Sequence, residues 1–550
     1  MSDPVVAPAE PVGDVAVAVR IAGVSAAETL GWVRAAAAAM RAAGLAGATD
    51  IVASPGRVTV AYDPLSGIDP VALGGQMTAI AATARREAGI EPVRHEIAVA
   101  YDGPDLEQVC ALHGISRVQF VAAHTAPEYF VEAIGFLPGF GYLAGLPTNL
   151  ATPRRATPRR VVPAGAVGIG GGQTGVYPFA SPGGWNLVGR SNQPLFDASR
   201  PRPALFEVGD RVRFVEADLP PGVAAPSAPP ARVAARPAAI TVVRPGLFTT
   251  IQDLGRPGYR AAGVPLSGAA DRLSLRLANL LVGNPDDTAA IECTLLGPTL
   301  RFERDSLVAL VGGDFPGLAT GVVTRVAAGT ELSIGHATRG CRGYLAVAGG
   351  IDVDPVLGSR STLVVAGLGG YAGRPLRAGD RLAVGAGGSN GTSGAEGGPR
   401  ACARGLDVVD GTRHADARVL RIIPGEHAEA FGGAAWSRGF RVSSRSDRMG
   451  LRLEGEPLPG AGAFAGMASV AVFPGTVQVP PDGQPIVLLA DAQTIGGYPV
   501  LGQVIAADLP QAAQLRPGDE LRFDMVSLAE ARVAHRAQEA ALAALREAMR

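Results

Sequence analysis

The sequence contains no lysine, and all 49 of its basic residues are arginine. A Walker-type phosphate loop, a Schiff-base lysine, a biotinylated lysine carrier and a Ser–Ser–Lys amidase centre each require a lysine side chain. The composition therefore excludes all four kinds of site from this chain.

Cysteine is also scarce. Its four residues lie far apart and form no C-x-x-C pair: Cys110, Cys293, Cys341 and Cys402. This spacing predicts free thiols in a reducing compartment. No two of the seven histidines have the i, i+4 spacing of a helical metal site, so we expect no protein-held metal.

Long apolar runs and an excess charge are missing as well. The N-terminus has no basic region followed by an apolar core, so no signal peptide is expected. Residues 161–189 carry no charge, but nine glycines and three prolines interrupt them and exclude a membrane helix. With a formal net charge of −1, nothing favours nucleic acid or a membrane as partner. We expect a cytoplasmic protein, and the sequence leaves a homo-oligomer open.

Glycine (74) and proline (44) are abundant, which predicts many turns and short strands. The first hundred residues follow a different pattern, in which longer helical segments lie between the predicted strands. Alternating apolar residues predict strands at 15–22, 48–53, 57–63 and 93–101, and longer apolar-periodic segments predict helices at 26–43 and 70–88. This β-α-β-β-α-β order predicts a small split-βαβ domain over residues 1–100.

A repeated nine-residue pattern organises the remainder. It occurs as FEVGDRVRF (206–214), LRAGDRLAV (376–384) and LRPGDELRF (515–523). Each copy is a Gly-Asp turn followed by a half-exposed strand, so we predict three related β-barrels. The predicted boundaries are 101–217, a Pro/Ala-rich linker at 218–238, 239–400, 401–525 and a terminal helix at 526–550. The fold class is thus α+β and β-rich: a split-βαβ domain followed by three barrels.

A second pattern marks candidate site residues. Gln173-Thr174 precedes Tyr177-Pro178, and Gln493-Thr494 precedes Tyr498-Pro499. Glutamine and tyrosine supply neutral hydrogen-bond donors in glycine-rich loops that a small ligand can approach. The hypothesis is that His124, Gln173 and Tyr177 line one pocket, His124 as acid or base. Gln493 and Tyr498, with Asp253, Arg256 and Arg445, would line a second one. Purely structural turns remain the alternative.

Several long motifs resemble known families. GFLPGFGYL and ATPRRATPRRVVPAGAVGIGGGQTGVYPFASPGGWNLVGR (151–190) are similar to the B subunit of bacterial 5-oxoprolinase, also called Kip-inhibitor-like or allophanate hydrolase subunit 1. PGLFTTIQDLGRPGYRAAGVPLSGAADRLSLRLANLLVGN (245–284), RSDRMGLRLEG (445–455) and LADAQTIGGYPVLGQVIAADL (489–509) resemble the C subunit, which is the carboxyltransferase-like or allophanate hydrolase subunit 2 family. The chain therefore resembles a fusion of both subunits.

The resemblance implies cyclophilin-like barrels and a hydrolase acting on a cyclic amide. It implies ATP-driven opening of 5-oxo-L-proline to L-glutamate with the separate A subunit of 5-oxoprolinase, and ATP (with Mg) bound in the assembled complex. The catalytic candidates are then His124, Gln173, Tyr177, Gln493 and Tyr498. The substrate-binding candidates are Arg190, Asp253, Arg256 and Arg445.

Two alternatives stay open. The same pair of folds forms the carboxyltransferase part of biotin-dependent urea carboxylase, which would act on a urea-like amide. Without lysine, this chain has no covalently attached biotin, and a carrier would have to act in trans. The second alternative is a Kip-type kinase inhibitor. The part of the chain that resembles the C subunit argues against it, because a pure kinase inhibitor would not need that part.

Overall fold

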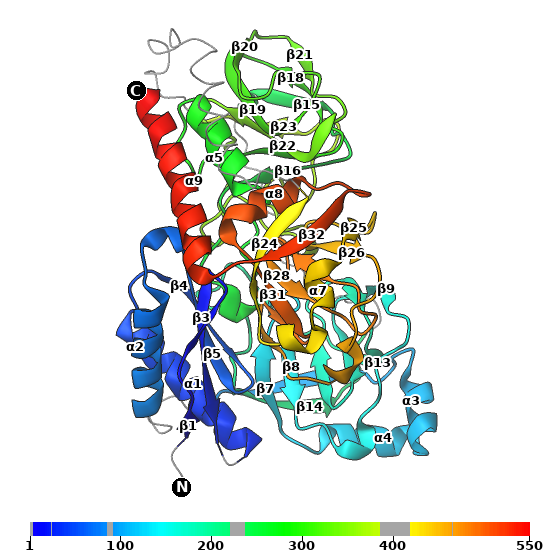
Figure 1. The fold of residues 1–550 in the computed structure, drawn as a ribbon. Coiled ribbons are helices and arrows are strands. Elements are labelled where there is room, and N and C mark those ends of the chain that lie inside the picture. Colours follow the sequence, from blue (N-terminus) through cyan, green and yellow to red (C-terminus); the bar gives the residue numbers. More distant parts are fainter. Residues whose placement is uncertain are drawn as a thin grey trace.

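A computed structural model describes residues 4–23, 25–84, 92–220, 237–385, 418–464 and 466–549. The chain forms an N-terminal α/β domain and three barrel-like β-domains (Figure 1). Below, the N-terminal domain and the first β-domain are called the first half, and the rest the second half. Residues 221–236 of the predicted linker, Cys402 and His414 lie outside the described residues.

The N-terminal domain has one sheet covered by two helices. The strand order is β1-β3-β5-β4, and β2 also pairs with β3. The elements are β1 (Val5–Val6), β2 (Glu10–Val12), β3 (Ala16–Ala22), α1 (Ala26–Ala43), β4 (Ala48–Ser54), β5 (Arg57–Tyr62) and α2 (Pro70–Thr83). Ser25 caps α1 by accepting the Glu28 N–H at 3.2 Å, and left-handed Gly44 ends it. Both predicted helices are therefore confirmed, α2 with an earlier end.

The strand predicted at 93–101 exists but belongs to another sheet. It is β6 (Arg94–Val99), and it pairs in parallel with β14 (Arg211–Glu216) over its whole length. Ile97 and Val99 are buried in the core of the first β-domain. The split-βαβ order is therefore wrong at its last strand, because the burial of these side chains ties β6 to the following domain.

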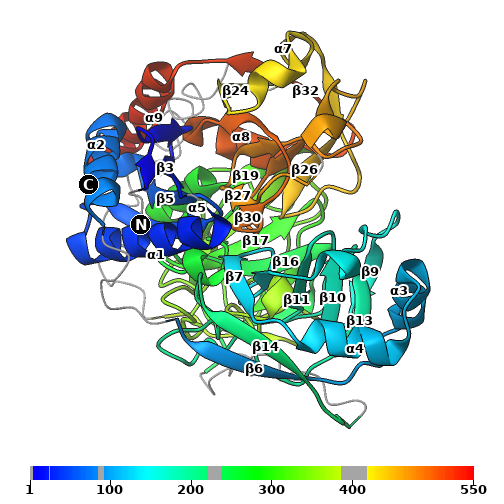
Figure 2. The ribbon, with the colours of Figure 1, turned by 90° about the horizontal axis from the view of Figure 1, so that it is seen from below.

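The first β-domain is a seven-stranded sheet in the order β13-β10-β11-β8-β7-β14-β6. Ala100 and Arg190 exchange two backbone hydrogen bonds at 2.9 Å, which joins the two edges. Its other elements are α3 (Leu106–His113), α4 (Arg117–Thr125), β7 (Tyr129–Ile134), β8 (Gly141–Ala144), β9 (Arg159–Val162), β10 (Ala166–Gly170), β11 (Gln173–Val176), β12 (Ser181–Gly183) and β13 (Asn186–Arg190). Figure 2 shows α3 and α4 at the outer edge of this domain.

The second β-domain consists of two sheets, β21-β18-β15-β23 and β16-β17-β22-β19-β20, with helix α5 packed on the larger one. The elements are β15 (Ile240–Arg244), β16 (Phe248–Gln252), α5 (Arg272–Leu281), β17 (Ala290–Thr294), β18 (Thr299–Phe302), β19 (Ser306–Asp314), β20 (Val323–Val326), β21 (Glu331–Ser333), β22 (Arg339–Val347) and β23 (Arg381–Leu382).

The third β-domain is a closed barrel in the order β24-β31-β28-β29-β26-β25-β32. The elements are β24 (Val419–Pro424), α7 (Ala434–Ser437), β25 (Phe440–Val442), β26 (Gly450–Glu454), β27 (Val470–Ala471), β28 (Thr476–Gln478), β29 (Ile486–Leu488), β30 (Ile495–Gly496), β31 (Val500–Val504), α8 (Leu509–Gln514) and β32 (Glu520–Met525).

The three Gly-Asp repeats adopt the same local structure. Asp210, Asp380 and Asp519 each accept the backbone N–H three residues earlier, at 2.7 to 2.9 Å. The glycine before each aspartate has a φ near +90° and donates to a valine carbonyl of a neighbouring strand. The strands that follow are β14, β23 and β32. β14 and β32 each pair in parallel with the first strand of their domain, whereas β23 pairs antiparallel with β15. The predicted equivalence therefore holds for the turn in all three domains and for the strand pairing in two.

Polar contacts fix the N-terminal domain to the second half. Asp50 accepts the N–H groups of Gly258 at 3.0 Å and Arg260 at 2.8 Å, and Asp14 accepts that of Ala506 at 2.9 Å. The two halves therefore contact each other through buried carboxylates as well as through apolar side chains.

Helix α9 (Leu528–Ala548) forms a second connection. It starts at the N-terminal domain and runs along the second β-domain, as the red helix of Figure 1 shows. Ser527 and Glu530 form the predicted capping box. Both Nη atoms of Arg276 on α5 donate to the carboxylate of Glu539, at 2.5 and 2.8 Å.

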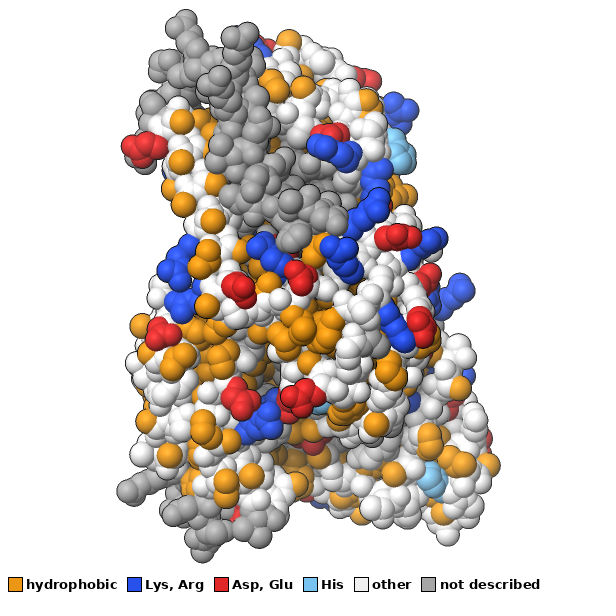
Figure 3. All heavy atoms as spheres, viewed as in Figure 1, with side chains coloured by type: hydrophobic (Ala, Val, Ile, Leu, Met, Phe, Trp, Pro, Cys, Tyr) orange, Lys and Arg blue, Asp and Glu red, His pale blue; other side chains and the backbone are white. Residues whose placement is uncertain are grey.

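Acidic and basic side chains are interspersed on the face seen in Figure 3. Within the described ranges, no helix combines the length and apolar composition needed to cross a membrane. The same residues contain no group of three or more His, Cys, Asp or Glu side chains placed to hold a metal ion.

Candidate functional site

The two Gln-Thr turns lie close together where the halves meet. Gly135, at the end of β7, lies against Ile495 of β30: a Cβ on Gly135 would fall 2.5 Å from the Ile495 Cβ. Burial raises the pKa of Tyr142 on β8, and the charges of Tyr177 and Glu132 in the first half and of Tyr498 in the second half raise it further. Residues from both turns therefore surround Tyr142.

Several polar groups at this place remain accessible. Gln173 Nε2 donates to Glu132 Oε1, and Gln493 Nε2 donates to Gln478 Oε1 at 3.2 Å. Tyr498 is 36% exposed, while Glu132, Gln173 and Gln493 are half-buried. We call this set the junction site: Glu132, Tyr142, Gln173, Gln478, Gln493 and Tyr498.

The glycine hairpin before β11 leaves room beside the junction site. A Cβ added to Gly171 or Gly172 would meet no atom within 4 Å. Burial raises the pKa of the Glu132 carboxyl, and the hydrogen bond from Gln173 lowers it in part. A carboxyl with a raised pKa beside amide and phenol groups can bind an amide, polarise its carbonyl and exchange a proton with it.

The junction site fits an amide better than a nucleotide triphosphate. Arg154, an exposed residue, is the cation whose charge acts on Tyr142. The phosphates of a nucleotide triphosphate are bound by cationic groups, and the six residues of the junction site include no arginine. We therefore assign no ATP-binding residues in this chain.

Two predicted catalytic residues are part of the core instead. The side chain of His124 is fully buried, and its ring contacts Tyr101 Oη at 2.8 Å and Thr174 Oγ1 at 3.1 Å. Burial lowers the pKa of His124 to about 3, so the ring is neutral at physiological pH. Tyr177 is 2% exposed, and burial raises its pKa to about 12. The acid–base role expected of His124 does not fit, because neither solvent nor substrate reaches it.

The predicted substrate-binding residues are scattered. Arg190 Nε pairs with Asp102 Oδ2 at 2.9 Å, and its Nη atoms donate to the backbone carbonyls of Leu219 and Pro220. Arg445 is exposed and meets Glu454 at 3.4 Å. Among the described residues, no contact links Arg190 or Arg445 to the glutamines of the junction site. The structure therefore does not bring these two arginines together with the predicted catalytic residues.

Asp253 and Arg256 are both buried in the second half. Asp253 accepts from Ser359 Oγ at 2.7 Å and from the Arg360 N–H at 2.5 Å, which shapes a loop. Arg256 Nη2 donates to the Ser361 carbonyl, while its Nε and Nη1 have no hydrogen-bond partner among the described residues. Burial lowers the pKa of Arg256 to about 10, although the nearby Asp253 raises it in part.

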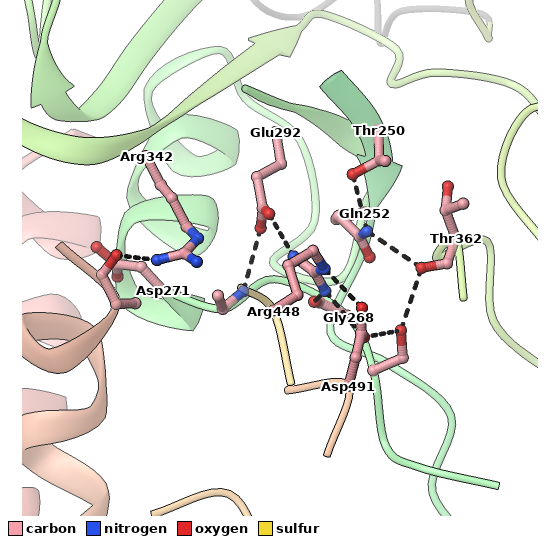
Figure 4. Close-up of polar contacts among 12 residues, drawn as sticks. Thr250, Gln252, Gly268, Asp271, Glu292, Arg342, Thr362, Arg448 and Asp491 are labelled. Atoms are coloured by element: carbon pink, nitrogen blue, oxygen red, sulfur yellow. Dashed lines mark hydrogen bonds and ion pairs between the residues drawn. The ribbon is translucent and has the colours of Figure 1, made fainter. Parts of the chain in front are cut away.

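A buried ionic network that the sequence analysis missed lies next to them (Figure 4). Arg448 donates to Glu292, to both carboxylate oxygens of Asp491 and to the Gly268 carbonyl. Ser267 Oγ donates to Asp491 Oδ1 at 2.8 Å. Asp491 is two residues from Gln493, so this network anchors the second turn of the junction site. Arg448 lies in the same motif as Arg445, and only the burial of its partners distinguishes the two.

The arginine-rich loop at 152–160 has an internal partner. Arg155 and Arg159 both donate to Asp105 Oδ1, at 3.1 and 2.6 Å. Asp105 Oδ2 accepts the Leu187 N–H at 2.7 Å. These two guanidinium groups therefore hold the loop on the first β-domain.

Comparison with known proteins defines the class first. The family described as carboxyltransferase domain, subdomain C and D, matches residues 8–206, and carboxyltransferase domain, subdomain A and B, matches residues 262–525. The chain is 40% identical over 311 residues to the 5-oxoprolinase C subunit of Escherichia coli (strain K12), covering 54% of this chain and 95% of that protein. It is 56% identical over 123 residues to the 5-oxoprolinase B subunit of Escherichia coli O157:H7, covering 22% of this chain and 56% of that protein.

Solved structures agree with these matches. The crystal structure of TTHA0988 superposes with a TM-score of 0.76 at 35% identity, covering 92% of this chain and 99% of that one. The Kluyveromyces lactis urea amidolyase gives a TM-score of 0.50 at 30% identity over 56% of this chain and 20% of that one. The chain belongs to the carboxyltransferase-domain family of the 5-oxoprolinase B and C subunits, with both parts fused in one chain.

Proposed function

We propose that this chain is the combined B and C component of an ATP-dependent 5-oxoprolinase. It converts 5-oxo-L-proline to L-glutamate together with a separate A subunit, and ATP with Mg²⁺ is bound in the assembled complex. The observation that carries the proposal is the junction site, which takes polar groups from both halves in a chain whose relatives bear the 5-oxoprolinase name.

The residues of the junction site match the chemistry of a lactam. A lactam carbonyl is a weak electrophile, so donors aimed at its oxygen lower the barrier to attack. Gln173, Gln493 and Tyr498 would supply such donors. Glu132 would take a proton from the attacking water as its oxygen bonds to the carbonyl carbon. The C–N bond then breaks, and the ring nitrogen receives the proton.

Reconstitution tests this proposal. The purified chain is mixed with ATP, Mg²⁺ and 5-oxo-L-proline, with and without the candidate A subunit, and released L-glutamate is measured. We expect glutamate only in the complete mixture, because this chain lacks a phosphate loop and lysine. Rapid turnover by the chain alone, or none in the complete mixture, contradicts the proposal.

A second candidate function is carboxyl transfer from carrier-borne biotin to a urea-like amide. The relative that favours it is the urea amidolyase of Saccharomyces cerevisiae, which is 34% identical over 333 residues. The match covers 18% of that protein. Biotin-dependent carboxylation of urea in the presence of a biotin carboxylase and its carrier protein, without glutamate release from 5-oxo-L-proline, supports this alternative.

A further inference from the structure

A pocket lies where the two halves meet, and none of the six junction-site residues lines it. Its volume is about 280 Å³. One wall is helix α1 with the neighbouring strand β4, the second is the loop at 201–208 of the first β-domain, and the third is the turn at 258–262 of the second half. This volume suits a metabolite-sized ligand rather than a nucleotide or a peptide.

The charge of the lining is unbalanced. Its charged residues are Arg34, Arg41, Arg202 and Glu207, which gives a formal charge of +2. Glu207 Oε1 is 2.8 Å from Arg202 Nη1, and the charge of Glu207 also acts on Arg41. Arg41 itself donates to the Ile51 carbonyl at 3.5 Å, an acceptor that carries no full charge. Among the lining residues, one carboxylate thus stands beside three guanidinium groups and acts on two of them, Arg202 and Arg41.

The position of Arg34 depends on the Gly-Asp turn. Its side chain passes over Gly209: a Cβ there would fall 1.8 Å from Arg34 Cδ and 2.5 Å from Nε. At the equivalent glycines, Gly379 and Gly518, an added Cβ would meet no atom within 4 Å. Of the three equivalent turns, only the one at Gly209 packs against an arginine side chain. That arginine, Arg34, lines the pocket.

The remaining walls are apolar and held in place. Ala37, Ala38, Pro203 and Phe206 contribute apolar surface. The third wall includes Tyr259, whose turn is fixed by the two hydrogen bonds that Asp50 accepts. The pocket thus combines cationic groups with an apolar lining, and hydrogen bonds to Asp50 hold one of its walls in place.

We propose that this pocket binds a small organic anion, through a carboxylate or phosphate group held by Arg34, Arg41 and Arg202. Planar guanidinium groups match both oxyanions in geometry and charge. The apolar lining accommodates the carbon skeleton of the ligand. Because the walls come from both halves, a bound anion also stabilises their association. This proposal does not depend on the chain being a 5-oxoprolinase component.

Calorimetric titration of the full chain tests the proposal with four probes. They are inorganic phosphate, L-glutamate, 5-oxo-L-proline and uncharged 2-pyrrolidone, which is the lactam ring without its carboxylate. We expect at least one anion to bind and to raise the melting temperature, more weakly at high salt, while 2-pyrrolidone leaves this pocket unoccupied. Phosphate and the carboxylates are titrated separately, which tells the two oxyanions apart.

Substitutions assign the binding to this pocket. Arg41→Gln and Arg202→Gln should each weaken the anion by about tenfold or more, because each removes a charged hydrogen-bond donor. Arg325→Gln is the matched control, since Arg325 is an exposed arginine paired with Asp305 at 2.9 Å elsewhere. Arg202 is exposed, so its variant keeps the test valid even if Arg41→Gln lowers stability. The proposal is wrong if none of the anions binds the unmodified chain at millimolar concentration. It is equally wrong if both variants bind as tightly as the control.

Discussion

The guanidinium group of Arg448 and the carboxylate of Asp491 form a bidentate ion pair inside the second half. Nε of Arg448 donates to Oδ2 at 2.7 Å, and Nη2 donates to Oδ1 at 3.1 Å. The same guanidinium contacts Glu292 of the second β-domain, so one side chain connects two domains. Arg448 holds the pKa of Glu292 below its usual value despite complete burial, and the two carboxylates raise the pKa of Arg448.

Substitution of Arg448 should be costly. Arg448→Met leaves Glu292 and Asp491 buried without their cation, and breaking a buried pair in this way costs about 3–5 kcal/mol. The free energy of unfolding in urea measures this cost. Arg445→Met is the control three residues away, and we expect it to cost at most about 1 kcal/mol because its pair with Glu454 is exposed. Equal losses for both variants contradict the assigned roles.

Asp14 should make stability depend on pH. Burial raises the pKa of Asp14 from 3.8 to about 6, and nearby Asp508 adds to the rise. The folded state therefore binds this proton more tightly than the unfolded state, so the contribution of Asp14 to stability falls as pH increases from about 4 to about 6. Asp14→Asn removes that decline while keeping an oxygen for the Ala506 N–H.

The Asp14→Asn variant should therefore gain stability relative to the unmodified chain above pH 6. The gain approaches roughly 3 kcal/mol, since one pKa unit corresponds to about 1.4 kcal/mol. At pH 4 the two proteins should differ little. Unfolding midpoints measured from pH 4 to pH 8 test this, and a difference that is independent of pH contradicts it.

The sequence predicted the elements whose signals are local. The Ser527 capping box, the Gly-Asp turns and the terminal helix all depend on residues within a few positions of each other. Helix α4 was not predicted, although Ser116 and Gln119 form a capping box that marks its start. The glycine and proline content of the flanking segments obscured that signal.

The surroundings of the predicted site residues depend on burial, and burial is decided by tertiary contacts. The repeated pattern predicted two pockets, one in each half, whereas Tyr142 is affected by charges from residues beside both turns. Arg445 and Arg448 differ by three positions, yet only Arg448 meets buried carboxylates from other segments. His124 looks like an acid–base residue in sequence, but it is enclosed by Phe120 and Phe214. No local pattern distinguishes these outcomes.

The two turn glutamines should matter for turnover but not for folding. Gln173→Ala and Gln493→Ala each remove a donor from the junction site, and loss of a transition-state donor typically lowers the rate about 100- to 1000-fold. Glutamate release with the A subunit present measures the rate, and the melting temperature reports folding. Gln108→Ala on the exposed face of α3 is the control and should retain full activity. Near-normal turnover of both junction variants contradicts their role.

Glu132 should set the acid limb of the pH–rate profile. A carboxylate that accepts a proton from water works only when ionised, and burial raises its pKa. The hydrogen bond from Gln173 favours the ionised form, so Gln173→Ala should raise the pKa of Glu132 further and move the acid limb to higher pH. Gln493→Ala is the matched control, because Gln493 donates to Gln478 rather than to Glu132 and should lower the rate without moving the limb. Glu132→Gln should abolish turnover and the limb together. An acid limb that stays in place in Gln173→Ala, or that persists in Glu132→Gln, would mean that another group takes the proton.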